Sequence, residues 1–301
     1  MSTRILITGG TGFIGQQLCQ SLLADGARLT VLSRQDPVTV KSLCGRVETT
    51  NSLENLRGHP GFDAVINLAG EGIAEKRWSQ SRKQALVDSR VALTRKLAEI
   101  IRSWEQKPEV LVSGSAVGFY GDQGSARVNE GTPPNDEFTH RMCADWENEA
   151  LTLEEDGVRI CLSRTGLVVG PDGGFLQKML LPFRLGLGGR LGDGQQYMPW
   201  IHRTDVVNAL LWMLREPQAS GPYNVVSPAP VTNREFTRTL AGVLHRPALF
   251  PAPSFALRLA MGEMSRLLLT GQKAVPDRLT EAGFSFRFSE LEPALRDAIG
   301  G

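Results

Sequence analysis

Four glycines near the start of the chain, at positions 9, 10, 12 and 15, are spaced as in loops that bind phosphate groups. The spacing fits Gly-x-Gly-x-x-Gly from Gly10 and Gly-x-x-Gly-x-x-Gly from Gly9. In such a loop one glycine makes the turn, one lets the backbone approach a pyrophosphate, and one lets a helix pack on a strand. The free N–H groups of that helix then face the phosphates. The residues expected to bind a dinucleotide here are Gly9, Gly10, Thr11, Gly12, Phe13, Ile14 and Gly15.

Two residues at the end of the second predicted strand indicate which nicotinamide cofactor is bound. A site for NAD usually has an acidic residue there, which holds the ribose 2′-hydroxyl. This chain has Ser33 and Arg34 instead. A guanidinium and a serine hydroxyl suit a 2′-phosphate, so we predict NADP(H) over NAD(H). The alternative is that Arg34 is a solvated surface residue and that Asp36 holds the ribose.

A serine and a tyrosine after a central predicted strand are candidates for the reaction itself. Ser115, or Ser113 two places earlier, would lie at the carboxyl end of that strand, where ligands bind in open α/β sheets. Its hydroxyl would hold a substrate carbonyl or hydroxyl, and the alternative is a serine that caps a loop. Tyr120 would donate a proton, or would pack against the cofactor or the loop with equal plausibility.

Further candidates follow a buried strand and open a later segment. Four of these candidates are expected to shape the cofactor pocket. The other five are expected to contact substrate, and the alternatives for them are a surface ion pair or plain packing. They are Asn67, Leu68, Ala69 and Gly70 for the cofactor, and Glu71, Arg77, Trp78, Trp200 and His202 for the substrate.

The elements that must position these residues alternate between strand and helix, which is typical of a parallel sheet covered by helices. We therefore predict an α/β fold, a Rossmann-like doubly wound parallel sheet with a smaller mixed C-terminal substrate cap. The strand before the glycines and the helix after them favour a binding loop over a turn that binds nothing. The predicted strands are 5–7, 28–32, 63–70 with its glycine loop, 110–112, 158–162 and 223–226, and the predicted helices are 16–24, 81–103, 138–155, 205–215 and 232–244.

A change in character near Gly170-Pro171 divides the chain. Beyond it glycine and proline become frequent and the predicted strands become shorter. We expect residues 1–166 to form the NADP-binding Rossmann domain and residues 167–301 to form the cap, interleaved with the last strands of the sheet. Such a cap would lie over the carboxyl ends of the strands and would build the substrate pocket.

The composition favours a soluble, cytoplasmic, metal-free protein with a small-molecule substrate. The net charge is +1 without a basic run, so neither nucleic acid nor a membrane is an expected partner. No signal peptide or stretch of membrane-spanning length is present. The four cysteines show no C-x-x-C spacing and the four histidines are dispersed, which indicates reduced thiols and no metal site.

Several motifs carry a family resemblance that covers nearly the whole chain. They are Thr8-Gly-Gly-Thr-Gly-Phe-Ile-Gly15, Asn67-Leu-Ala-Gly-Glu71, Arg77-Trp78, Ser89-Arg90-Val91, Ser113-Gly-Ser-Ala-Val-Gly-Phe-Tyr-Gly121, Arg164 with Gly170-Pro171, Pro182-Phe-Arg-Leu-Gly-Leu-Gly-Gly189 and Trp200-Ile-His-Arg-Thr-Asp205. With them the chain resembles the extended short-chain dehydrogenase/reductase superfamily, in its epimerase and dehydratase group, and more closely the YfcH-type "epimerase family" proteins. The resemblance implies a Rossmann fold, a nicotinamide cofactor and, by analogy, a possible homodimer formed through helices 81–103 and 138–155.

One departure from that superfamily concerns the acid/base pair. Active members use Tyr-x-x-x-Lys at the start of the helix after the serine strand, and the lysine lowers the tyrosine pKa so that the phenol can pass a proton as hydride moves. Here that helix begins Phe138-Thr-His-Arg-Met, with neither residue in any register. His140 is the only imidazole near the vacated position, and histidine as a residue type suits proton transfer near neutral pH, although a half-exposed helix residue is the simpler interpretation.

Two functions fit these observations. The first is an atypical NADP(H)-dependent oxidoreductase or epimerase that acts on a small polar carbonyl or sugar-like substrate. Ser115 would orient that substrate, and Tyr120, His140 or a water molecule would move the proton. The second is a catalytically silent NADP(H)-binding redox sensor that acts through a protein partner, which the missing Tyr/Lys pair favours.

Overall fold

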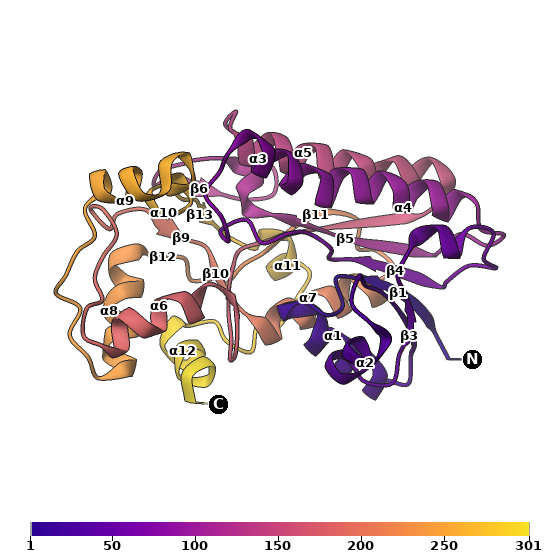
Figure 1. Cartoon of the computed structure of the whole chain (residues 1–301), viewed down its shortest axis with the longest axis horizontal. Coiled ribbons are helices and arrows are strands. Elements are labelled where there is room, and N and C mark those ends of the chain that lie inside the picture. Colours follow the sequence, from indigo (N-terminus) through magenta and orange to yellow (C-terminus); the bar gives the residue numbers. More distant parts are fainter. Residues whose placement is uncertain (1, 301) are drawn as a thin grey trace.

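A seven-stranded parallel sheet forms the centre of the molecule (Figure 1) in the computed structural model, which describes residues 2–300. The strand order is β3-β2-β1-β4-β5-β7-β11. The strands are β1 (Arg4–Thr8), β2 (Arg28–Leu32), β3 (Glu48–Thr50), β4 (Ala64–Asn67), β5 (Val110–Ala116), β7 (Arg159–Thr165) and β11 (Gly221–Val225). The order reverses on either side of β1, so the predicted Rossmann-like doubly wound α/β fold is confirmed.

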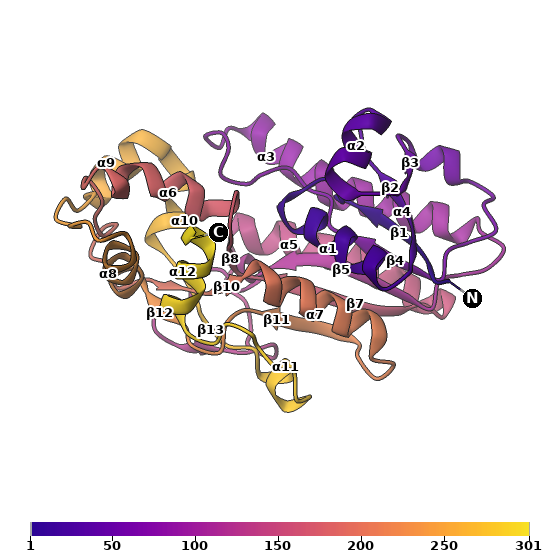
Figure 2. The same cartoon turned by 90° about the horizontal axis from the view of Figure 1, so that it is seen from below.

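Helices cover both faces of this sheet (Figures 1 and 2). One face carries α1 (Phe13–Ala24), α2 (Pro37–Cys44) and α7 (Arg203–Arg215), and the other carries α4 (Leu93–Arg102) and α5 (Phe138–Leu151). Alternate residues of each strand therefore enter different cores. In β1, the side chains of Ile5 and Ile7 join the first core and that of Leu6 joins the second. Because both faces are buried, the strand is apolar from Ile5 to Ile7.

The long helix predicted at 81–103 is interrupted. It consists of α3 (Gln80–Val87), a π-helical turn at Asp88–Ala92 and then α4. A π turn inserts one extra residue and rotates the side chains that follow it, and such turns are frequent at functional sites. Hydrophobic periodicity alone does not reveal a single inserted residue.

The strand that carries Ser113 and Ser115 is longer than predicted. β5 continues past Val112 to Ala116, and its last four residues pair with β7 from Leu162 to Thr165. Ser113 and Ser115 are therefore strand residues, and the loop begins only with a 3₁₀ turn at Val117–Tyr120. The predicted boundary was wrong because small polar residues inside a buried strand resemble a loop in sequence.

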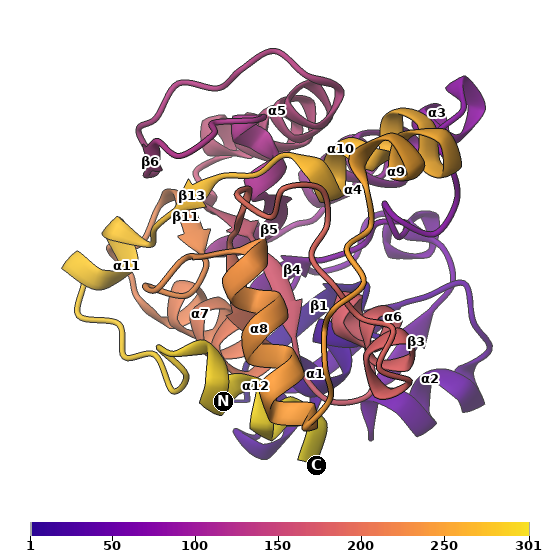
Figure 3. The same ribbon diagram turned by 90° about the vertical axis from the view of Figure 1, so that its left-hand side faces the viewer.

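Most of the remaining elements lie beyond the carboxyl ends of the strands (Figures 1 and 3), whereas α11 (Asp277–Glu281) packs beside β11. The larger ones are α6 (Gly174–Arg184), α8 (Asn233–Leu244), α9 (Ser254–Met261) and α12 (Leu291–Gly300), with the short elements β6 (Arg127–Val128), β8 (Leu167–Val169), β9 (Tyr197–Met198), β10 (Trp200–His202), β12 (Val231–Thr232), β13 (Lys273–Ala274) and α10 (Arg266–Leu269). Thr232 caps α8 in a capping box with Glu235, as the sequence predicted. Between these elements the chain returns to the main sheet through α7 and β11.

Candidate functional site

The glycine loop joins β1 to α1 and has the geometry of a phosphate cradle. Gly9 has a φ of +72°, and a Cβ there would stand 2.6 Å from the backbone of Leu68. A Cβ at Gly15 would collide with the carbonyl oxygen of Gly9, so both positions require glycine. Gly12 is the N-cap of α1, and no side chain within residues 2–300 caps this end. The first N–H groups of α1 are therefore available to an anion.

At the end of β2, Arg34 has no hydrogen-bond or ion-pair partner among residues 2–300. Arg34 is exposed, and Ser33 beside it accepts a hydrogen bond from the Gln35 N–H at 3.2 Å. The Asp36 carboxylate caps α2 instead, because it accepts hydrogen bonds from the N–H groups of Val38 and Thr39, both at 3.0 Å. Further contact with the Thr39 hydroxyl at 2.6 Å helps to hold the Asp36 pKa below its usual range. A cavity of about 680 Å³ has both Ser33 and Arg34 in its lining.

The side chain of Asn67 is hydrogen-bonded to neighbouring elements and is not available to a ligand. Its Oδ1 accepts a hydrogen bond from the Thr8 hydroxyl at 2.6 Å, and its Nδ2 donates to the Thr94 hydroxyl at 2.8 Å. The N–H of Ala69 donates to the same Thr8 hydroxyl at 3.1 Å. Asn67 is fully buried. The segment from Leu68 to Gly70 thus lies fixed against the glycine loop, and only its remaining backbone groups are available to the cofactor.

The segment after β4 is held by arginines from the interrupted helix. Glu71 forms an ion pair with Arg82, whose Nη2 also donates to the Gly72 carbonyl at 2.7 Å. Arg90 Nη2 donates to the Glu71 carbonyl at 2.7 Å. The expected grouping of Glu71, Arg77 and Trp78 is therefore not formed. Arg77 lies against Gly262, and the Trp78 indole donates to the carbonyl of Ile73 at 3.0 Å.

Arg90 is a half-buried cation that sequence analysis did not assign to the site. It lies in the π turn, with its guanidinium beside Gly70 and 5.5 Å above the Trp146 ring. Burial lowers its pKa, and it forms no ion pair with another described residue. The nearby Arg82 Nε and Trp146 Nε1 are buried without a hydrogen-bond partner in residues 2–300. Unpaired buried donors of this kind are expected where a ligand supplies acceptors.

The two candidates on and after β5 belong to a buried hydrogen-bond network. Ser115 donates to Glu147 at 2.6 Å, and the same carboxylate pairs with Arg164 through two contacts of 2.8 Å. The Tyr120 hydroxyl donates to Asn224 at 2.7 Å and accepts from Arg164 at 3.0 Å. Tyr120 is fully buried, and burial raises its pKa to about 12. The expectation that Tyr120 gives its proton to substrate is at odds with this geometry.

His140 is the candidate whose reactive nitrogen stays free. It is half-buried in the first turn of α5, and its Nδ1 lies 2.8 Å from the carbonyl oxygen of Phe119. A carbonyl oxygen can only accept, so this contact places the proton on Nδ1 and leaves Nε2 as an acceptor. Among residues 2–300, the ring of His140 makes no hydrogen bond through Nε2. Of Ser115, Tyr120 and His140, only His140 therefore has an unpaired proton-transfer atom.

Trp200 and His202 are both buried. Trp200 is fully buried, and its indole donates to the Ala229 carbonyl at 3.0 Å. His202 is 1% exposed, caps α7 by accepting from the Thr204 N–H, and packs against the tilted ring of Phe288 with ring centres 4.1 Å apart. Burial lowers its pKa to about 4. Trp200 is enclosed in the core, whereas His202 lines a polar cavity beside α1, so the expected contact of His202 with substrate stays a prediction.

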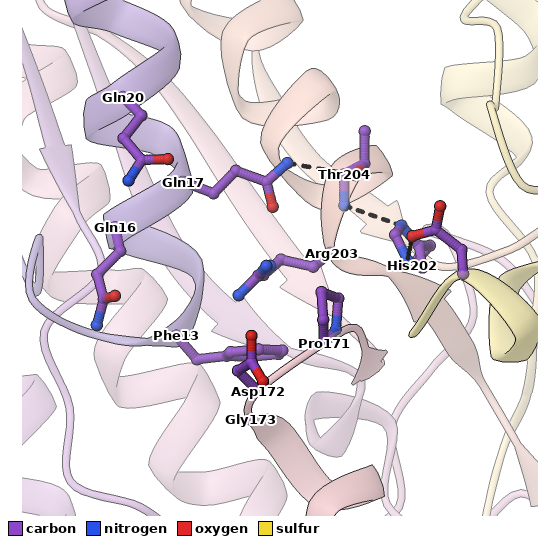
Figure 4. A pocket seen from close by; sticks show the side chains of 11 residues that line it. Phe13, Gln16, Gln17, Gln20, Pro171, Asp172, Gly173, His202, Arg203 and Thr204 are labelled. Atoms are coloured by element: carbon purple, nitrogen blue, oxygen red, sulfur yellow. Dashed lines mark hydrogen bonds and ion pairs between the residues drawn. The ribbon is translucent and has the colours of Figure 1, made fainter. Parts of the chain in front are cut away.

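A polar cavity of about 590 Å³ lies between α1 and the segments after β8 and β10 (Figure 4). Gln16, Gln17 and Gln20 form one wall, and Arg203 reaches toward the ring of Phe13. The Arg203 guanidinium lies 4.6 Å from the centre of that ring. The side chain of Phe13 therefore points away from the other residues of the glycine loop. Its ring connects that loop to the segment after β8.

Comparisons with known proteins place these features in a family. A model described as "NAD dependent epimerase/dehydratase family" matches residues 5–227, and one described as "Domain of unknown function (DUF1731)" matches residues 252–298. "Epimerase family protein MW0731" of Staphylococcus aureus (strain MW2) is 38% identical over 296 residues, with 98% of each chain covered. "Epimerase family protein SERP0438" of Staphylococcus epidermidis is 38% identical over 300 residues, with 98% of this chain and 99% of the relative covered.

Two solved structures of epimerase-family or epimerase proteins are similar to this chain. Human epimerase family protein SDR39U1 (isoform 2), solved with NADPH, superposes with a TM-score of 0.90 at 36% identity over 99% of each chain. The nucleoside-diphosphate sugar epimerase from Corynebacterium glutamicum has a TM-score of 0.79 at 27% identity, and the match covers all of this chain and 59% of that one.

Proposed function

The chain belongs to the NAD dependent epimerase/dehydratase family, and from this premise we propose that it is an NADP(H)-dependent oxidoreductase or epimerase of atypical type. Its substrate would be a small polar carbonyl or sugar-like compound. The observation that carries the proposal is the glycine cradle, in which Gly9 and Gly15 admit only a bare backbone and the start of α1 offers free N–H groups.

The preference for NADP(H) rests on two neighbouring side chains. Arg34 is exposed at the end of β2, where a guanidinium can pair with a 2′-phosphate. Asp36, the carboxylate that would otherwise hold a ribose hydroxyl, is engaged in capping α2. The human relative, solved with NADPH, supports the same choice.

In this proposal, bound nicotinamide supplies the hydride acceptor or donor, and the chain supplies the proton and the orientation. His140 Nε2 accepts or returns the substrate proton, while its Nδ1–H stays bonded to Phe119. Arg90 holds a polar oxygen at the ends of β4 and β5, because its charge has no internal carboxylate partner. Ser115, bonded to Glu147, is a positioning residue that shapes the end of β5.

The experiment measures NADPH oxidation with a panel of carbonyls and nucleotide sugars. We expect His140→Asn to lower kcat by about a hundredfold or more, as loss of an acid/base group does. The matched control is Tyr120→Phe, which removes a buried hydroxyl and should lower stability while sparing kcat. Because an epimerase returns its hydride to the substrate, epimer formation is followed by chromatography in the same reactions. The absence of both NADPH oxidation and epimer formation above background, with every substrate, would defeat the proposal.

A redox sensor is the second candidate. It is favoured because the hydroxyl groups of Ser115 and Tyr120 both donate hydrogen bonds to buried side chains of the protein. A sensor must differ between its NADP⁺ and NADPH forms, because a ligand shifts a conformational equilibrium only through differential affinity. Identical hydrogen-exchange protection in the two forms would remove this candidate.

A cytoplasmic location remains part of the proposal. All four cysteines are free and buried, as suits a reducing compartment. We also keep a metal-free mechanism, to be tested by the insensitivity of turnover to a chelator.

A further inference from the structure

The polar cavity beside α1 contains an arginine whose charge has no partner. Arg203, the first residue of α7, is half-buried there, and its guanidinium lies over the ring of Phe13. It forms no hydrogen bond or ion pair with any residue from 2 to 300, and its Nε is buried. Burial lowers the Arg203 pKa, which the nearby carboxylates of Asp172 and Asp297 oppose. Unpaired polar groups inside a fold are expected where a ligand or an ordered water supplies the partner.

A second unpaired donor lines the same cavity. The Nδ1 of His202 accepts from the Thr204 N–H, so the ring proton lies on Nε2. Nε2 is buried without a hydrogen-bond partner in the described chain. The Asp297 Oδ2 lies 3.2 Å from it, but not in line with the N–H. Because burial lowers the His202 pKa to about 4, the ring is neutral at pH 7 and adds a donor without a charge.

The opposite wall of the cavity supplies acceptors. The Nε2 atoms of Gln16 and Gln17 both donate within the chain, at 2.9 Å and 3.2 Å, which leaves each amide oxygen without a partner in residues 2–300. Gln20 is exposed, and its side chain makes no hydrogen bond within that range. The carboxylates of Asp172 and Asp297 add further acceptors, and neither pairs with the cavity arginine. Acceptors therefore face unpaired donors across the cavity.

The charges that line the cavity favour a neutral ligand. Arg203 is the lining cation, and Asp172 and Asp297 are the lining anions. Arg287 is a further cation near His202, outside the lining. An anionic ligand would face two carboxylates and a cationic ligand would face the guanidinium, so a charge of either sign meets a like charge. A hydroxyl group both donates and accepts, so a ligand with several hydroxyls can join both walls without a charge of its own.

We propose that this cavity binds a neutral polyhydroxylated compound, a monosaccharide or a cyclic polyol, at a site separate from the glycine cradle. Arg203 and His202 donate to its hydroxyls, and the carboxylates and glutamine oxygens accept from them (Figure 4). The volume of about 590 Å³ lies within the range of small-molecule sites. The cradle uses the first N–H groups of α1, whereas the glutamines extend as far as Gln20, further along that helix.

This inference does not depend on the proposed reaction, because the two sites lie on opposite faces of the sheet. His140 belongs to α5 and Arg90 to the π turn before α4, and α4 and α5 cover one face. The cavity is built on α1 and α7, which cover the other. A sugar bound as substrate should therefore respond to a substitution of His140, and a sugar bound in the cavity should not.

The test is saturation-transfer difference NMR of the full chain, titrated separately with D-glucose, D-galactose, D-ribose and myo-inositol. We expect at least one of them to bind. Arg203→Met keeps an unbranched stem against Phe13 and should weaken that binding by about tenfold or more, since it removes a charged donor. Arg215→Met is the matched control on the same helix, because Arg215 is exposed, pairs with Asp25 and lies outside the cavity. It should leave binding unchanged.

A second variant keeps the test decisive if Arg203→Met fails to fold. Gln20→Trp places a large ring in the cavity from an exposed position, so the protein should fold and lose sugar binding. His140→Asn should bind the sugar as the native chain does. Thermal melting monitored by circular dichroism checks that each variant is folded.

Four results would overturn the proposal. The first is no binding of any of the four compounds, or binding that Arg203→Met and Gln20→Trp leave unchanged. The second is loss of binding in His140→Asn, which would assign the sugar to the reaction site. The third is displacement of the sugar by inorganic phosphate, which would make the cavity an anion site. The fourth is displacement of the sugar by NADPH, which would make it part of the cofactor site.

Discussion

Glu147 is the side chain that joins the serine strand to the helix after it. It is 4% exposed, and its carboxylate accepts hydrogen bonds from Ser115 and from two nitrogens of Arg164. The Arg164 guanidinium also lies 3.4 Å from the centre of the Phe119 ring. A buried charge with this many partners fixes the end of β5 and the start of the loop that carries Tyr120.

We predict that Glu147→Ala destabilises the protein by about 3–5 kcal/mol, because it leaves the Arg164 charge buried and unpaired. Urea unfolding measures this. The matched control is Glu149→Ala on the same helix, whose partner Arg95 is exposed, and its expected effect is below about 1 kcal/mol. Equal losses for the two variants would show that the buried pair has no special part in stability.

Residue types near the glycines were predictable from sequence, but their partners were not. The Ser33-Arg34 pair and the capping of α8 follow local rules that act within a few residues. The partner of Glu71 depends on where α3 begins, and the structure selects Arg82 over Arg77. The position of Arg90 depends on the π turn, and hydrophobic periodicity in the sequence does not predict such a turn.

The unit of β1, the glycine loop and α1 is where local sequence and function coincide most closely. The strand, the turn and the helix were all predicted because each has its own signal: an apolar run, a glycine spacing and a helical period. Shorter elements were not predicted, since two-residue strands such as β6 and β13 carry no period and depend on pairing with each other.

We predict that Gly9→Ala weakens cofactor binding while the protein still folds. A Cβ at Gly9 meets the Leu68 backbone, and the φ of +72° costs a non-glycine residue about 1–2 kcal/mol in addition. Titration with NADPH should show at least about a tenfold loss of affinity. Gly242→Ala is the control, because a Cβ at that position would meet nothing within 4 Å and alanine favours the helix α8. Unchanged NADPH affinity in Gly9→Ala would exclude this loop as the cradle.

At the scale of the whole molecule, the chain first forms six strands of the central sheet, then the elements around α6, and then adds α7 and β11 to the sheet. The predicted change of character after Gly170-Pro171 corresponds to the departure into α6, but α7 and β11 complete the main sheet and its cover. Phe13 and Arg203 then connect the glycine loop to the later part of the chain. This return could be anticipated only in outline, because the partner of an edge strand is set by topology and not by its own sequence.

The most direct test of the account is a fluorescence titration with NADPH and with NADH, in the native chain and in Arg34→Ala. The account predicts tight NADPH binding and weak NADH binding by the native chain. Loss of one charge-assisted contact should weaken NADPH binding by roughly tenfold to a hundredfold in Arg34→Ala, with NADH binding unchanged. An Arg34→Ala variant that keeps both its NADPH affinity and its preference over NADH would contradict the assignment of the 2′-phosphate site, and no binding of either nucleotide would contradict the cradle itself.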